Sequence, residues 1–169
     1  MILKVAPELH IEGWVHSATA GIPEAWIFCH GYNTTLIQSL QILGQMASFG
    51  NFPNYIKPFI FTWPAGKNFL QFYPAFYNSC NAEIHKNFHH FLLSLRDNGI
   101  RQFHIMVHSM GSRMFLMSMR KIVEDSSLFA TVKKDVPSTD RVHQIELVTL
   151  TFLNPEYYLK DFVEKVKNL

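Results

Sequence analysis

Short, largely apolar runs that alternate with segments of helical periodicity constrain the fold of this chain most strongly. The runs cover residues 25–29, 59–63, 103–107 and 145–152. Apolar runs of this length are typical of strands buried on both faces, as in parallel sheets. Because segments with helical spacing separate the runs, the sequence predicts an α/β fold, a mostly parallel sheet with helices on both faces.

The segments between the runs predict helices over residues 36–47, 81–98 and 110–124 and at the C-terminus. Thr34 or Thr35 can cap the first helix, and Gly99 is expected to end the second. An alternating stretch at 10–17 predicts an antiparallel strand near an edge. Residues 66–77 are aromatic and are expected to be irregular, and residues 125–143 are expected to form a loop.

Composition bounds the remaining possibilities. The 169 residues fit a single domain spanning 1–169, and 48% hydrophobic residues exclude a disordered chain. A net charge of +2 without a basic stripe predicts no nucleic-acid partner. Two cysteines, no apparent signal peptide and no apolar run long enough for a membrane span indicate a cytoplasmic location.

Polar or turn-forming residues follow each predicted buried strand. They occupy residues 30–33, 63–66, 108–111 and 154–156. In parallel sheets of this kind, ligands bind at the carboxyl ends of the strands. The sequence therefore places its candidate site at this end of the sheet.

Ser109 lies where the third run ends and a helix begins. A strand that turns sharply into a helix exposes such a serine as a nucleophile, and the amide of Met110 can then donate to an oxyanion. Gly111 supplies the small residue that the turn needs two positions later, whereas Val107 is bulkier than the pattern prefers two positions earlier. The alternative is that Ser109 caps the helix.

The turn after the first run supplies the complementary part of the site. Gly31 lets the backbone approach closely, and the amide of Tyr32 is expected to be the second oxyanion donor. The alternative is a tight turn that Asn33 caps. A turn that begins with His30 and a serine elbow at neighbouring strand ends favour the catalytic interpretation.

These residues carry a family resemblance. The chain resembles α/β-hydrolases, and more narrowly a bacterial esterase/lipase-like branch of uncharacterised activity, over residues 25–165. The matching stretches are 28–33 (FCHGYN), 61–66 (FTWPAG), 81–82 (NA) and 107–113 (VHSMGSR), and LNPE at 153–156 takes the place of a Pro-Asp pair. The resemblance implies that Ser109 is the nucleophile and that Met110 and Tyr32 give the oxyanion amides.

The resemblance also exposes a departure. In this class the acid and the histidine of the triad follow the last two strands, in the order Ser, acid, His. Here only one helix follows the strand near 145–152, so we expect a domain truncated after that strand. Among other residues, His30 is the candidate base and Glu156 the candidate acid. His108 adjoins the serine but is expected to point elsewhere.

Two further patterns are weaker. His85 and His89 are four residues apart on a predicted helix and could reach one ion, but no third ligand has a suitable spacing, so we expect no metal and no cofactor. The aromatic stretch 69–77 could line an acyl pocket or form a partner surface, although packing is the simpler explanation.

Two functions remain open. The first is a serine hydrolase that cleaves a small acyl ester or thioester through Ser109. The second is a catalytically incomplete hydrolase domain that binds a partner chain, or a second copy of itself, at the exposed edge of the strand near 145–152. The partner could even supply the missing histidine.

Overall fold

A parallel four-stranded sheet forms the centre of the molecule. The computed structural model describes residues 23–124, 128 and 144–167. The strands are β1 (Glu24–Cys29), β2 (Ile56–Phe61), β3 (Gln102–His108) and β4 (Glu146–Leu153). All pairs are parallel and the order is β2-β1-β3-β4, which confirms the predicted α/β class. The strand expected at 10–17 and, apart from Leu128, the loop expected at 125–143 lie outside the described residues.

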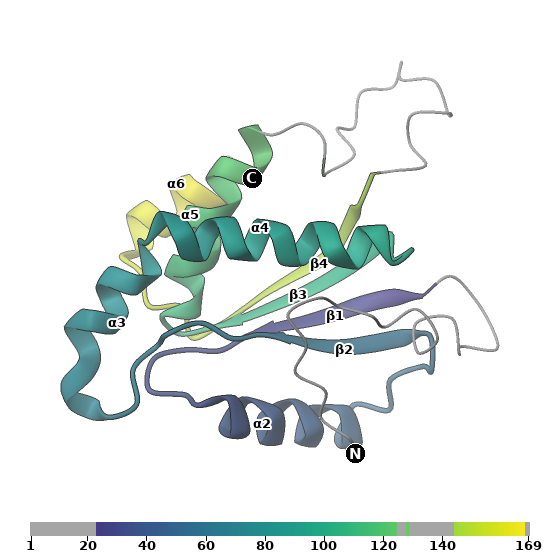
Figure 1. Ribbon diagram of the computed structural model, residues 1–169, viewed down its shortest axis with the longest axis horizontal. Helices are drawn as coiled ribbons and strands as arrows, with labels where there is room; N and C mark the ends of the chain where they lie inside the picture. The colour runs from purple at the N-terminus through teal and green to yellow at the C-terminus, as the bar shows by residue number, and fades with distance from the viewer. Residues whose placement is uncertain (1–22, 125–127, 129–143, 168–169) are drawn as a thin grey trace.

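Helices cover both faces of this sheet (Figure 1). Helix α2 (Leu36–Phe49) lies on one face, and α4 (Ala82–Asp97), α5 (Gly111–Glu124) and α6 (Leu159–Lys167) lie on the other. The short 3-10 helix η1 (Phe69–Gln71) and helix α3 (Phe72–Ser79) stand beyond the carboxyl ends of the strands.

Two apolar clusters, one on each face, hold these layers together. The alternating side chains of β1 belong to both: Ile27 packs in the larger cluster, beneath α4 and α5, while Trp26 and Phe28 pack with Leu43 of α2. Every residue from Ala25 to Cys29 is buried. This two-sided burial explains why the first run is apolar at consecutive positions.

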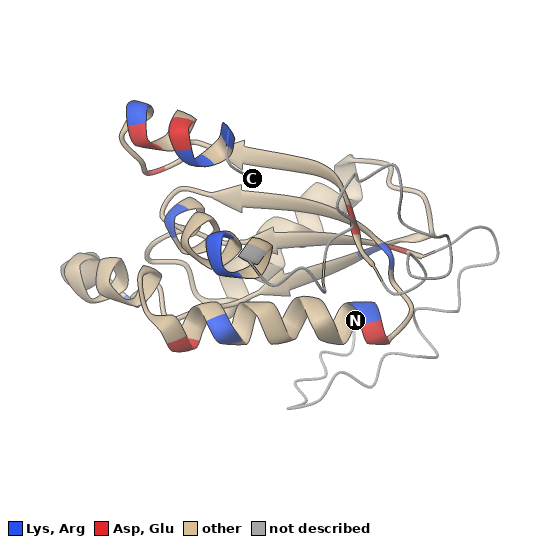
Figure 2. Ribbon diagram, turned by 90° about the horizontal axis from the view of Figure 1, so that it is seen from above, with Lys and Arg blue, Asp and Glu red and all other residues tan. Residues whose placement is uncertain are grey.

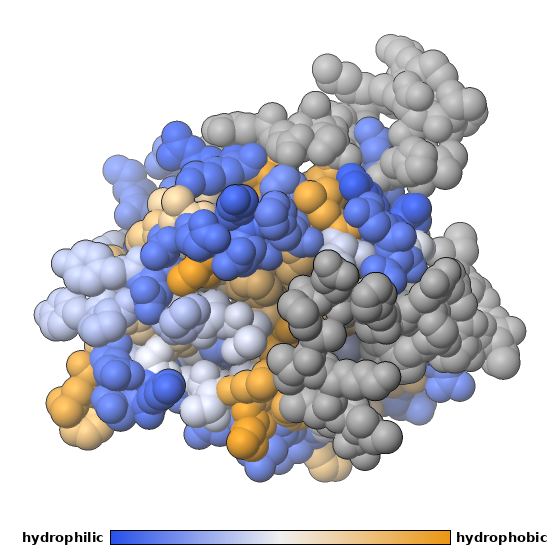
Figure 3. Space-filling view, in the orientation of Figure 1, coloured by the Kyte–Doolittle hydropathy of each residue, from blue (hydrophilic) through white to orange (hydrophobic). Residues whose placement is uncertain are grey.

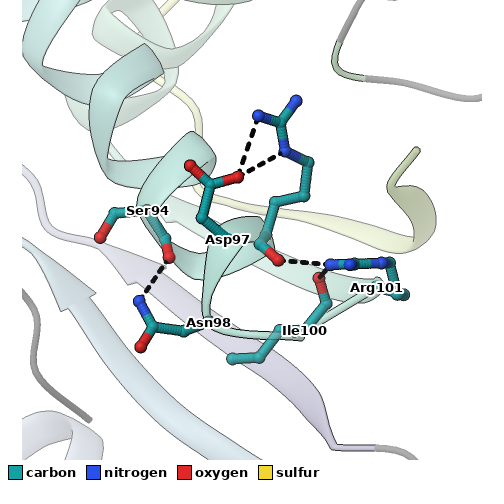
Figure 4. Close-up of polar contacts among 6 residues, drawn as sticks. Ser94, Asp97, Asn98, Ile100 and Arg101 are labelled. Carbon is teal, nitrogen blue, oxygen red and sulfur yellow. Dashed lines mark hydrogen bonds and ion pairs between the residues drawn. The ribbon is translucent and has the colours of Figure 1, made fainter. Parts of the chain in front are cut away.

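Local signals set the helix ends that the sequence predicts. Thr35 caps α2 in a capping box with Gln38. At the end of α4, Asn98 donates from Nδ2 to the Ser94 carbonyl at 2.8 Å, and Gly99 has φ 92°. Figure 4 shows that Arg101 also donates to backbone carbonyls at this helix end. These contacts end α4 and direct the chain into β3.

The second strand lies earlier than predicted. It begins at Ile56 and ends at Phe61, whereas the sequence indicated 59–63. Pro58 lies inside the strand, opposite Trp26, and is tolerated because β2 is an edge strand with a partner on one side only among the described residues. Trp63 lies beyond the end of the strand, and its amide donates to the ring of His30.

The expectation of irregular structure over 66–77 is wrong. Residues 69–71 form η1 and residues 72–79 form α3. The side chain of Asn68 caps η1 by accepting from the Leu70 amide at 3.0 Å. Pro74 occupies the first turn of α3, where its missing N–H removes no helical hydrogen bond. The high aromatic content and the proline concealed this helix in the sequence.

Candidate active site

The carboxyl ends of β1 and β3 meet at the point where the strand order reverses. The chain passes from β1 to β2 on one side and then crosses back to β3 on the other. Sheets of this type bind ligands in the crevice at such a switch point. The turn after β1 and the turn after β3, both singled out from the sequence, lie at this position.

Ser109 forms a sharp turn between β3 and α5. Its φ is 50°, the left-handed region that non-glycine residues rarely adopt. Its amide donates to the Leu153 carbonyl at 3.0 Å, and its carbonyl accepts from the Ser112 amide at 3.0 Å. Val107, where a small residue is usual, is fully buried in β3 and does not prevent this turn. Ser109 therefore has the backbone of a nucleophile elbow.

Two glycines bring the two turns into contact. A Cβ built on Gly31 would lie 2.8 Å from the Cβ of Ser109, and one built on Gly111 would lie 2.5 Å from the His30 carbonyl oxygen. Neither distance leaves room for a side chain. The absence of a Cβ at these positions lets the turn after β1 pack directly against the elbow.

The two predicted oxyanion donors lie in these turns. Within the described ranges, neither the amide of Tyr32 nor that of Met110 donates a hydrogen bond. The next amide, that of Asn33, donates to the Ala65 carbonyl at 2.7 Å. The Tyr32 side chain is fixed as well, because its hydroxyl donates to the Asn68 carbonyl at 2.9 Å. Both amides thus lack an acceptor among the described residues, as an oxyanion donor requires.

The His30 ring joins β1 to β2. Its Nδ1 lies 3.0 Å from the Gly31 carbonyl oxygen, which can only accept, so Nδ1 carries the proton. Its Nε2 accepts from the Trp63 amide at 3.3 Å and lies 3.1 Å from the Thr62 hydroxyl. Burial lowers the pKa of His30, and the nearby His108 lowers it further. With both nitrogens engaged, the ring offers no free nitrogen to Ser109.

His108 is the last residue of β3 and is half-buried. Its Nδ1 lies 3.0 Å from the position that a Cβ on Gly31 would take. Burial lowers the pKa of His108, so the ring is neutral near neutral pH. The ring packs against the turn after β1 and helps to position it.

Glu156 lies beside the elbow, but its carboxylate is directed to Arg113. Its amide donates to the Ser109 carbonyl at 3.2 Å, while Oε2 pairs with Arg113 Nε at 3.4 Å. The Arg113 guanidinium also lies 4.4 Å from the ring centroid of Phe76 and 4.8 Å from that of Tyr157. Arg113 therefore connects α3, α5 and the loop before α6 at the elbow.

Sequence reasoning did not assign this role to Arg113. The residue stands in the VHSMGSR stretch four positions after Ser109, so it lies on α5, one turn from the elbow. Phe76 and Tyr157 are aromatic, but their sequence positions do not show that they flank one cation. Only the packing of α3 against α5 reveals the arrangement.

The histidines of α4 do not assemble a metal site. His85 is buried and its Nε2 bonds to the Ser79 carbonyl oxygen at 2.9 Å. Across the described residues, no group of three His, Cys, Asp or Glu side chains could hold an ion. In the same part of the chain, no helix has the length and apolar character needed to cross a bilayer.

A parallel sheet with a left-handed serine at its switch point and glycines that bring two turns together defines the α/β-hydrolase class. The family profile described as "Alpha/beta hydrolase of unknown function (DUF900)" matches residues 14–161. The chain belongs to this family. Searches of curated proteins and of solved structures found no match.

Proposed function

We propose that this chain is a serine hydrolase of the esterase type, which cleaves a small acyl ester or thioester through Ser109. The left-handed backbone of Ser109 at the switch point is the observation that carries the proposal. This conformation is strained, and strain of this kind is typical of functional sites. A serine that merely capped α5 would not need it, since capping residues have extended backbones.

In the proposed reaction, the Ser109 oxygen attacks the carbonyl carbon of the ester. The amides of Tyr32 and Met110 then donate to the oxyanion of the tetrahedral intermediate. Collapse of this intermediate breaks the bond to the leaving group, which departs as an alcohol or thiol after taking up a proton. Water attacks the acyl-serine, releases the carboxylic acid and restores the Ser109 hydroxyl.

The Ser109 proton must pass to a base before the attack. The contacts of His30 and Glu156 support structural roles for both, because His30 bonds to the turn and to β2 and Glu156 pairs with Arg113. We assign the nucleophile to Ser109 and the oxyanion donors to the amides of Tyr32 and Met110. The base is assigned to a residue beyond the described ranges or to a partner chain.

The same contacts favour a second candidate function, a hydrolase domain that is catalytically incomplete and binds a partner. Strand β4 pairs with β3 on one side, and its other edge pairs with no strand of the described residues. An open edge of this kind can accept a strand from another chain. A partner bound there would lie beside β4, whose last residue, Leu153, accepts from the Ser109 amide.

Hydrolysis of p-nitrophenyl esters of increasing acyl length tests the two functions. The esterase proposal predicts turnover that Ser109→Ala abolishes and that the control Ser48→Ala leaves unchanged. Ser48 lies on the exposed side of α2, where its hydroxyl bonds only to the Gly44 carbonyl. Equal rates in the wild type and Ser109→Ala would contradict the proposal. No turnover by a folded wild-type chain would favour the incomplete domain.

A further inference from the structure

An exposed apolar surface lies on η1 and α3, beyond the strand ends that carry Ser109. We call this surface the outer face of α3. It consists of Phe69 and Leu70 of η1 and Tyr73 and Tyr77 of α3, which are 76%, 75%, 72% and 72% exposed. Leu70, Tyr73 and Tyr77 follow the spacing of one helical stripe. Figure 3 shows hydrophobic surface at the free end of α3, to the lower left.

The opposite face of α3 packs against the rest of the protein. Ala75 and Ser79 are fully buried, and Phe76 packs against the larger apolar cluster. A helix that is apolar on both sides is normally covered on both sides. The outer face of α3 is large and aromatic as well as exposed, which is typical of a surface that meets an apolar phase or a partner.

The charge around this face favours a lipid surface as the occupant. From Ala25 to Ala82 the sequence contains no Asp or Glu, and its charged residues are Lys57 and Lys67. In Figure 2, α3 carries no charged residue. A surface without carboxylates, with Lys67 at its border, is not repelled by anionic headgroups. Tyrosines are suited to the boundary between acyl chains and water.

The outer face of α3 is connected to the elbow through Tyr32. Tyr32, whose amide is a proposed oxyanion donor, packs its ring against Phe72 of α3 at 5.4 Å and bonds to the Asn68 carbonyl. Two further exposed apolar residues, Tyr158 and Leu159 at 80% and 78%, follow the carboxyl end of β4. The exposed apolar side chains thus lie on two segments, one before α4 and one after β4, at the same end of the sheet as Ser109.

We infer that the outer face of α3 docks onto a lipid surface and that the substrate ester is drawn from that surface. The inference rests on the proposed esterase function and names its substrate class, a lipid ester presented by a membrane or droplet. Docking would bring the carboxyl ends of β1 and β3 towards the lipid.

Flotation with vesicles measures the docking separately from the chemistry. The probes are vesicles of phosphatidylcholine and of phosphatidylcholine mixed with phosphatidylglycerol. Burying a large apolar side chain contributes enough to change partitioning by about tenfold or more. The double variant Leu70→Ser/Tyr73→Ser is therefore expected to partition at least tenfold less than the wild type.

Phe49→Ser is the matched control. Phe49 is 88% exposed, but it is the last residue of α2, at the opposite end of the sheet from α3 (Figure 1). This variant is expected to partition like the wild type. All the substituted side chains are exposed, so unfolding midpoints should stay close to that of the wild type.

The outcomes separate docking from catalysis. Ser109→Ala is expected to bind vesicles as the wild type does while losing turnover. A wild type that binds vesicles but hydrolyses no ester would overturn the esterase proposal and leave the docking intact. Failure of the wild type to bind either vesicle would overturn the inference. Equal binding by the double variant and the wild type would overturn it too. So would a wild type that forms a dimer and does not bind vesicles, if the double variant were a monomer.

Discussion

The backbone of Ser109 stores strain that a residue without a side chain would not experience. A left-handed conformation costs a non-glycine residue about 1–2 kcal/mol. Replacement by glycine removes that strain, and about half of the gain is offset by the greater freedom of glycine in the unfolded chain. We predict that Ser109→Gly raises the free energy of unfolding by up to about 1 kcal/mol, measured by chemical denaturation.

Ser48→Gly is the control for this prediction. Ser48 is exposed on α2 and has helical backbone angles, so glycine there should lower the free energy of unfolding by about 0.5 kcal/mol. Opposite signs for the same substitution would demonstrate the strain at Ser109. A loss of stability at both positions would contradict the left-handed conformation.

Gly31 tests the contact between the two turns. A methyl group there would lie 2.8 Å from the Cβ of Ser109, so the turn after β1 or the elbow must shift. We predict that Gly31→Ala lowers the free energy of unfolding by about 1–3 kcal/mol and reduces ester turnover. Gly44→Ala is the control, because its Cβ would meet nothing within 4 Å and should stabilise α2 slightly. Full turnover in Gly31→Ala would argue against the packed turns.

The sequence predicted several of these positions because their signals are local. A serine between an apolar run and a helix, with a glycine two residues later, suffices to indicate a sharp turn. The ring contacts of His30 and the partner of Glu156 could not be predicted, because they depend on Thr62, Trp63 and Arg113, which are distant in the sequence. The catalytic roles of Ser109, Tyr32 and Met110 remain predictions.

Among the secondary-structure elements, α3 is attached to the rest of the site in part through one cation. Arg113 of α5 contacts Phe76 of α3 and Tyr157, and its ion pair with Glu156 is partly exposed. A partly buried cation–π contact contributes about 0.5–2 kcal/mol, whereas a partly exposed ion pair contributes at most about 1 kcal/mol. The aromatic contacts should therefore outweigh the carboxylate.

We predict that Arg113→Leu lowers the free energy of unfolding by about 1–2 kcal/mol and that Glu156→Gln lowers it by less than about 1 kcal/mol. Loss of the cation should also free α3, which limited proteolysis within residues 66–81 would detect. Equal effects of the two substitutions would instead assign the attachment of α3 to the ion pair.

Elements with strong periodicity could be predicted, and those whose position depends on neighbours could not. The cap of α2 and the glycine after α4 are visible in the sequence and lie where expected. Strand β2 begins three residues early because its edge position tolerates Pro58, and the edge position is a property of the sheet. Helix α3 escaped prediction because its apolar residues point to both sides.

At the scale of the whole molecule, three histidines connect stability to pH. Burial lowers the pKa of His30, His85 and His108 below the ordinary value of 6.5. In the unfolded chain they take up protons as the pH falls through 6.5, while in the folded chain they remain neutral. The unfolded state thus binds more protons there, and the free energy of unfolding should fall, by up to about 1.4 kcal/mol per pH unit for each histidine.

His85→Gln tests this pH dependence at a histidine that lies outside the candidate site. Glutamine can still donate to the Ser79 carbonyl but does not titrate. Thermal unfolding midpoints measured above and below pH 6.5 should show a smaller acid-induced decrease in this variant than in the wild type. The same decrease in both proteins would show that His85 does not contribute.

The whole account depends on a reactive serine at the sheet's switch point. Fluorophosphonate labelling followed by peptide mass spectrometry measures this reactivity directly, with Ser109→Ala and heat-denatured protein as controls. We predict that the folded wild type carries one adduct, on the peptide containing Ser109, and that both controls carry none. A folded wild-type protein without an adduct, or with one on another serine, would contradict the proposal that Ser109 is the nucleophile of a hydrolase.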